Sequence, residues 1–65
     1  MDPAGDVATQ AILHNTVGVL ELRTGRHAAA EEHLTEAVVL SAAIADLFTL
    51  GGALCNLAIN TLRPS

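Results

Sequence analysis

Apolar residues recur at spacings of three and four along most of this chain, and no stretch alternates apolar and polar residues as a strand would. The spacing predicts three helices, over about residues 6–24, 27–44 and 46–62. The breaks between them are very short, and breaks this short make consecutive helices pack antiparallel. The sequence therefore predicts an all-α fold of three antiparallel helices.

The ends of the predicted helices carry residues that suit helix termini. Asp6 and Asp46 are expected to be the N-caps of the first and third helices, because a carboxylate accepts hydrogen bonds from free backbone N–H groups. Gly25 follows the first helix, where a left-handed turn favours a residue without a Cβ. Pro64 prevents the third helix from continuing.

Small residues flank a leucine in the second predicted helix. Ala30 and Ala37 allow two helix backbones to approach closely, and Leu34 is expected to fill the space between them. The helices and their tight corner at Thr24–Gly25–Arg26 then form one domain. That domain spans residues 6–62, with flanks at residues 1–5 and 63–65.

The chain also repeats itself over 40 residues. Residues 45–65 align with residues 5–25, and the apolar and small positions stay in register along the alignment. Four aligned pairs are identical: Asp6 with Asp46, Thr9 with Thr49, Leu22 with Leu62, and Arg23 with Arg63. The third helix is therefore expected to be a second version of the first.

Residues 11–44 resemble a tetratricopeptide (TPR) repeat, whose signature has a large residue, then Leu-Gly, a Gly that ends the first helix, and a small–apolar–small pattern in the second. The matching positions are His14, Val17, Gly18, Gly25, Ala30, Leu34 and Ala37. The chain departs from the family at His14, Glu21 and His27, where aromatic residues are common. Its period of 40 residues also exceeds the usual period of about 34.

The resemblance implies one and a half repeats of a long type, and a non-enzymatic protein–protein interaction module. In such arrays the first helices of successive repeats build the inner surface. The positions that match this surface are the candidate partner-binding residues Asn15, Val19, Leu22, Arg23, Ile59, Leu62 and Arg63. Two arginines and an amide beside an apolar strip would suit a peptide or helix that carries an acidic group.

Composition narrows the classes of function. The 65 residues are 51% hydrophobic, which argues against a disordered tail, and they carry a net charge of −4 with no lysine. This charge argues against nucleic acid and anionic membranes as partners, because both need a basic surface. Cys55 is the only cysteine, so no intrachain disulfide can form and we expect a reducing, cytoplasmic location. Because Cys55 lies in an apolar helix, we expect it to be a small buried hydrophobe.

A membrane span is the least favoured alternative. Residues 38–59 form an apolar stretch of spanning length with one charge, Asp46, near its middle. Inserting that carboxylate would cost roughly 2.5–3.5 kcal/mol, so we expect no membrane span.

No residue pattern predicts catalysis, a cofactor or a metal site. His27 and His33 are six residues apart, whereas zinc-binding pairs on a helix are three or four apart, and His14 lies on another helix. We expect these histidines at the surface or at the boundary of the core. The carboxylates of Glu31, Glu32 and Glu36 are expected on a solvated helix face. Close helix packing is the expected role of Gly51-Gly52.

The third predicted helix is the least polar part of the chain and is expected to need a cover. The residues expected to make that contact are Leu47, Leu50, Leu54, Leu57 and Ala58. Either a second copy of the chain or a helix of another protein could bury them. The expected partners are therefore another protein or peptide helix, with formation of a homo-oligomer, and a self-assembling structural unit is the alternative function.

Overall fold

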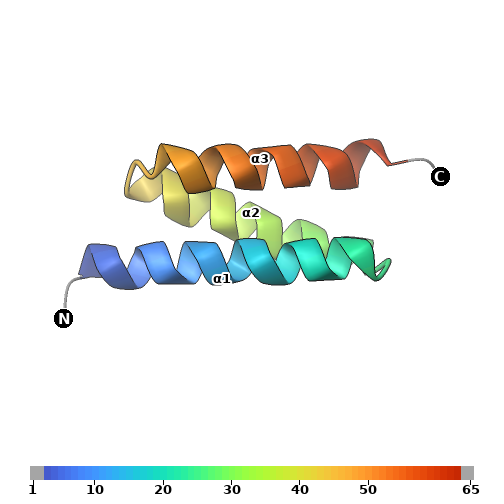
Figure 1. The fold of residues 1–65 in the computed structure, drawn as a ribbon, viewed down its shortest axis with the longest axis horizontal. Helices are drawn as coiled ribbons and strands as arrows, with labels where there is room; N and C mark the ends of the chain where they lie inside the picture. The colour runs from blue at the N-terminus through green and yellow to red at the C-terminus, as the bar shows by residue number, and fades with distance from the viewer. Residues whose placement is uncertain (1–2, 64–65) are drawn as a thin grey trace.

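The computed structural model describes the backbone of residues 3–63 and the side chains of residues 6–63. Its three helices are α1 (Pro3–Arg23), α2 (His27–Ala43) and α3 (Leu47–Leu62), and the described residues contain no strand. Figure 1 shows α1 and α3 running in the same direction, while α2 returns between them and contacts both. The predicted all-α fold of three packed helices is confirmed.

The start of α1 differs from the prediction. The helix begins at Pro3, and Asp6 lies in its first turn rather than acting as the N-cap. Proline suits the first helical position because its fixed φ matches the helix and its missing N–H has no partner there anyway. The Asp6 carboxylate then complements the positive end of the helix dipole from inside the first turn.

The first corner has the conformation that the sequence predicts. Gly25 has a φ of 82°, in the left-handed region. The Arg26 N–H donates to the Glu21 carbonyl at 2.8 Å, and the Gly25 N–H donates to the Leu22 carbonyl at 3.4 Å. These are the two hydrogen bonds of a Schellman motif, which satisfies the last carbonyls of α1 while the chain reverses.

The second corner uses the same motif with an unfavourable residue. The Asp46 N–H donates to the Ser41 carbonyl at 2.9 Å, and the Ala45 N–H donates to the Ala42 carbonyl at 3.1 Å. Ala45 takes the left-handed position with a φ of 56°. A side chain with a Cβ is strained in this region, so this corner stores a small energetic cost that the first corner avoids.

Asp46 is the N-cap of α3, as predicted. Its Oδ1 accepts from the Thr49 N–H at 3.1 Å, and its Oδ2 accepts from the Thr49 hydroxyl at 2.6 Å. These hydrogen bonds to Thr49 stabilise the ionised form and lower the pKa of the Asp46 carboxyl from its ordinary value of 3.8. The corner also interrupts the apolar segment 38–59, and no helix within residues 3–63 has the length and apolar character needed to cross a membrane.

The core is built from small side chains around one leucine. Ala30, Leu34 and Ala37 are fully buried, as predicted, and Ala11 and Ala53 join them from α1 and α3. α1 and α2 approach each other closely at Gly18, where an added Cβ would stand only 2.6 Å from Cγ and Cδ2 of Leu34. The absence of a side chain at Gly18 is therefore what allows Leu34 to lie between the two helices.

The Gly18→Ala variant should be less stable than the wild type by about 1–3 kcal/mol, because the new methyl group overpacks against the buried Leu34. Gly51→Ala is the matched control, since a Cβ at Gly51 meets nothing within 4 Å. That change should stabilise the chain by about 0.5–1 kcal/mol through helix propensity. Urea unfolding followed by circular dichroism measures both, and shifts of the same sign would contradict this packing.

The Ala45→Gly variant should be more stable than the wild type by about 0.5–1 kcal/mol, because glycine adopts the left-handed conformation of this corner without strain. Ala42→Gly is the control, since Ala42 is an exposed residue with helical conformation, and this variant should lose about 0.5–1 kcal/mol. Thermal melts of the three proteins test the difference. Equal losses in both variants would show that residue 45 is helical.

Candidate interaction surface

The structure brings Arg23 and Arg63, the last members of the two groups of predicted partner-binding residues, to the same end of the molecule. Figure 1 shows that the parallel helices α1 and α3 both finish at this end. Arg23 is exposed in the last turn of α1, and Arg63 is exposed directly after α3. The two arginines give this end of the molecule positive charge. Ile59, which is 57% exposed, and Leu62, which is 80% exposed, add apolar area.

The α1 side of this surface is more enclosed. Asn15, Val19 and Leu22 are half-buried. The Asn15 amide oxygen accepts a hydrogen bond from the Asn56 amide at 3.0 Å, and this pair joins α1 to α3. Asn15 therefore already holds the two parallel helices together, and a partner would reach only the rest of its amide.

Arg63 is also engaged within the chain, through a residue that the sequence analysis did not single out. The Arg63 guanidinium donates to the backbone carbonyl of Asn60. Asn60 is only 1% exposed, and its side-chain amide donates to the His27 carbonyl at 3.0 Å. The Asn60 amide oxygen lies 3.1 Å from Nδ1 of His27, so this ring nitrogen carries a proton and donates.

A third polar contact joins α1 to α2. Nδ1 of His33 lies 3.1 Å from the Ala29 carbonyl and also contacts the Glu21 carboxylate. Both partners are acceptors, so Nδ1 of His33 carries a proton. The His14 ring stacks on His33 with centroids 5.5 Å apart and an interplanar angle of 28°. Thus two residues that depart from the TPR pattern, His14 and Glu21, both pack against the same histidine.

These contacts give each of the three histidines a partner within the chain. His14, His27 and His33 are all half-buried, which agrees with the expected place at the surface or the boundary of the core. Within residues 3–63, no group of three His, Cys, Asp or Glu side chains is arranged to hold a metal ion.

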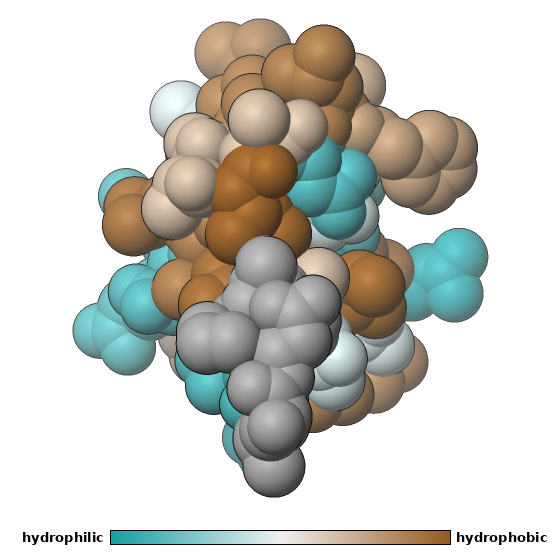
Figure 2. Space-filling model, turned by 90° about the vertical axis from the view of Figure 1, so that its left-hand side faces the viewer, coloured by the Kyte–Doolittle hydropathy of each residue, from teal (hydrophilic) through white to brown (hydrophobic). Residues whose placement is uncertain are grey.

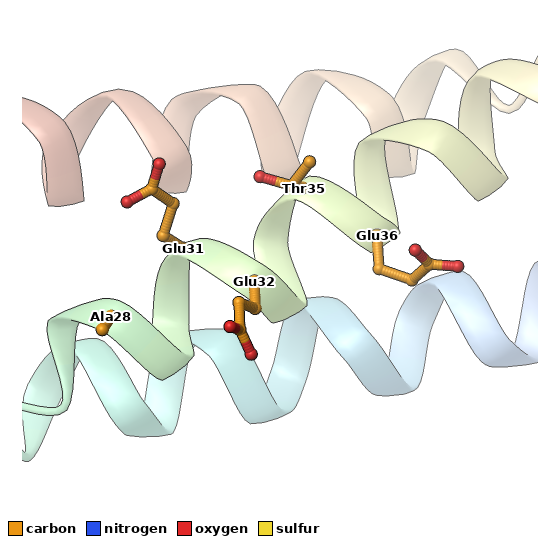
Figure 3. Close-up of a pocket in the computed structure, with 5 residues that line it drawn as sticks. All are labelled: Ala28, Glu31, Glu32, Thr35 and Glu36. Atoms are coloured by element: carbon orange, nitrogen blue, oxygen red, sulfur yellow. The ribbon is translucent and has the colours of Figure 1, made fainter.

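The outer face of α2 is acidic and solvated. A shallow depression on this face is lined by Ala28, Glu31, Glu32, Thr35 and Glu36. Figure 3 shows the three carboxylates pointing in different directions from the helix rather than toward a common centre. All three glutamates are exposed, as predicted, and they give this face a negative charge.

The exposed surface of α3 is largely apolar, and the residues predicted for self-association divide into two groups. Leu47 is 75% exposed and Leu54 is 48% exposed, and Ala58 is also exposed. Leu50 and Leu57 are half-buried instead. Figure 2 looks at the left-hand side of Figure 1 and shows hydrophobic residues gathered over the upper part of the molecule, where α3 lies.

Two predictions about α3 are wrong. Cys55 is exposed rather than buried, and the Gly51-Gly52 pair is not a point of close helix packing. A Cβ added at Gly51 would meet nothing within 4 Å, and one added at Gly52 would meet only Nδ2 of Asn15, at an ordinary contact distance of 3.9 Å. The reason is the orientation of α3, which buries Thr49, Ala53 and Asn60. Cys55 and Gly51 lie on another side of this helix. The glycine that does permit close packing is Gly18 in α1.

Comparison with known proteins yields no relative: no family model matches the chain, and neither a curated protein nor a solved structure matches it.

A double-mutant cycle on Asn15→Ala and Asn56→Ala should give a coupling energy of about 0.5–1.5 kcal/mol, because each amide uses the other as its partner across α1 and α3. Urea unfolding of the wild type, both single variants and the double variant supplies the four free energies. A coupling energy near zero would mean that Asn15 is free for a partner.

Proposed function

We propose that this chain is a non-enzymatic protein–protein interaction module with a TPR-like arrangement of one helix–turn–helix repeat and the first helix of the next. The sequence pattern of the family supports this proposal. So do the burial of Ala30, Leu34 and Ala37 and the left-handed Gly25 at the first corner.

The observation that carries the proposal is the distribution of large apolar side chains. Among the described residues, Leu34 is the only large apolar side chain that is fully buried. Those that remain exposed are Ile12, Leu13, Val17, Leu20, Val39, Leu47, Phe48, Leu54, Ile59 and Leu62. Extended apolar surface of this kind marks sites where proteins bind one another.

The partner that this surface favours is a peptide or helix with an acidic group. Arg23 and Arg63 lie at the end of the molecule where α1 and α3 finish, whereas the exposed glutamates lie on the outer face of α2. An incoming carboxylate could pair with the arginines while apolar side chains cover Ile59 and Leu62. Because the Cys55 thiol is exposed, a reducing location such as the cytoplasm is part of the proposal.

Self-assembly into a homo-oligomer is the alternative proposal. The exposure of Leu47 and Leu54 on α3 favours it, since two copies could bury these side chains against each other. Sedimentation or light scattering at micromolar concentration distinguishes a monomer from a homo-oligomer.

Affinity capture from cells that express the chain tests the interaction module. Proteins that the wild type retains should be lost when Arg23→Glu and Ile59→Asp are combined, because the double change removes both the charge and the apolar contact. Val39→Asp is the control, since Val39 is similarly exposed, at 56%, but lies on α2. All three proteins should melt alike, because exposed substitutions change stability by about 0.5 kcal/mol or less. Identical captured proteins from all three would contradict this surface.

A further inference from the structure

When α1 and α3 are aligned over the 40-residue repeat, the two helices turn different faces toward α2. On α1, Ala11 and Gly18 are buried, while His14 and Glu21 are half-buried. Three of these contact α2: Gly18 adjoins Leu34, and both His14 and Glu21 contact His33. Their counterparts on α3 are all exposed, and they are Gly51, Ala58, Leu54 and Thr61.

The converse also holds. On α3, Ala53 and Asn60 are buried and Leu57 is half-buried, and Asn60 bonds directly to His27 of α2. Their counterparts on α1 are Leu13, Leu20 and Val17, which are all exposed. The two helices aligned by the repeat therefore contact α2 through residues at different repeat positions. The exposed strip of α3 formed by Gly51, Leu54, Ala58 and Thr61 corresponds, in the repeat, to the strip of α1 that α2 covers.

We propose that this α3 strip binds a helix of the α2 type from a partner protein, antiparallel to α3. A folded second copy fits less well, because its own α2 already packs between α1 and α3 on its inner side and exposes glutamates on its outer side. The inference adds a second surface to the interaction module proposed above, and it uses none of the residues tested there.

The residues of the strip specify how the partner helix differs from α2. Ala58 stands where α1 has Gly18, and a Cβ at Gly18 would approach Leu34 to 2.6 Å, so the partner needs a small residue in place of Leu34. Gly51 stands where α1 has Ala11, and the space around it is open. The antiparallel register places residue 41 of an α2-like helix near this glycine, so a large apolar residue fits there.

The residue that meets the position of His33 also differs between α1 and α3. On α1 this histidine meets a ring and a carboxylate, from His14 and Glu21. On α3 the equivalent residues are Leu54 and Thr61, which offer an apolar side chain and no carboxylate. The partner helix should therefore carry an apolar residue at this position. Numbered as in α2, it should have a large apolar residue at position 33, a small residue at position 34 and a large apolar residue at position 41.

A synthetic peptide with the sequence of residues 26–45 and the changes His33→Leu, Leu34→Ala and Ser41→Leu provides the probe. Fluorescence anisotropy of the labelled peptide, titrated with the complete 65-residue chain, measures its affinity. We expect saturable binding at micromolar concentration. The peptide with the unchanged sequence should bind at least about tenfold more weakly, because its leucine meets the Cβ of Ala58.

Leu54→Glu in the chain should weaken binding of the redesigned peptide at least about tenfold, because it places a carboxylate in an apolar contact. Leu13→Glu is the matched control and should change the affinity less than about twofold, since Leu13 is similarly exposed but lies on α1. Circular dichroism verifies that both variants are folded, and Ala58→Gln replaces Leu54→Glu if that variant unfolds.

Three results would overturn the proposal: no saturable binding, equal binding to the Leu54→Glu chain, or a homodimer that Leu54→Glu dissociates. The last result would identify a second copy as the occupant of the strip. None of these results bears on capture through Arg23 and Ile59, so failure of this inference is distinguishable from failure of the interaction module.

Discussion

The close contact between Gly18 and Leu34 determines the dimensions of the rest of the fold. Because α1 has no side chain at this point, Leu34 reaches the α1 backbone, and an added Cβ would stand 2.6 Å from it. Helices that approach this closely leave room for little beyond methyl groups elsewhere along the contact. The other buried apolar residues are accordingly alanines, Ala11, Ala30, Ala37 and Ala53. Larger side chains are displaced to the surface, which explains how a chain with 51% hydrophobic residues keeps such a small core.

A core of alanines provides little resistance to sliding, and directional polar contacts supply what it lacks. Among the described residues, each pair of helices is joined by at least one such contact. Glu21 with His33 joins α1 to α2, His27 with Asn60 joins α2 to α3, and Asn15 with Asn56 joins α1 to α3. A displacement of one helix turn would separate these partners and leave the buried Asn60 amide without hydrogen bonds, which is costly in a low-dielectric interior. The polar contacts therefore define the register that the methyl groups leave open.

The same constraint underlies both proposed surfaces. Leucines excluded from a thin core must lie outside it, and here they lie mainly on α1 and α3 rather than on the acidic outer face of α2. The end of the molecule where α1 and α3 finish adds two arginines, which favours an acidic partner. The strip around Gly51 and Leu54 has no charged side chain, which favours an apolar helix. The module we propose would thus recognise partners by two different kinds of chemistry.

The sequence alone determined the local structure of this protein. Helical periodicity located three helices, Gly25 and Asp46 located their corners and caps, and the spacing of Ala30, Leu34 and Ala37 identified the inner face of α2. These features could be predicted because each depends on a few neighbouring residues. The start of α1 was misplaced since Pro3 and Asp6 both suit a helix start, and the two signals compete.

Only the tertiary structure decided which face of α3 turns toward α2. The face that α3 buries carries Thr49, Ala53 and Asn60, while its larger apolar side chains Leu47, Phe48 and Leu54 are exposed. Apolar periodicity places the apolar face of a helix inward, so it could not predict the burial of Asn60 or the exposure of Cys55. The partner-binding and self-association residues on α3 were proposed from the sequence, but their exposure depends on this rotation. The observed rotation matches contacts between residues far apart in the sequence, His27 with Asn60 and Asn15 with Asn56, because these hydrogen bonds require polar side chains of α3 to face the other helices.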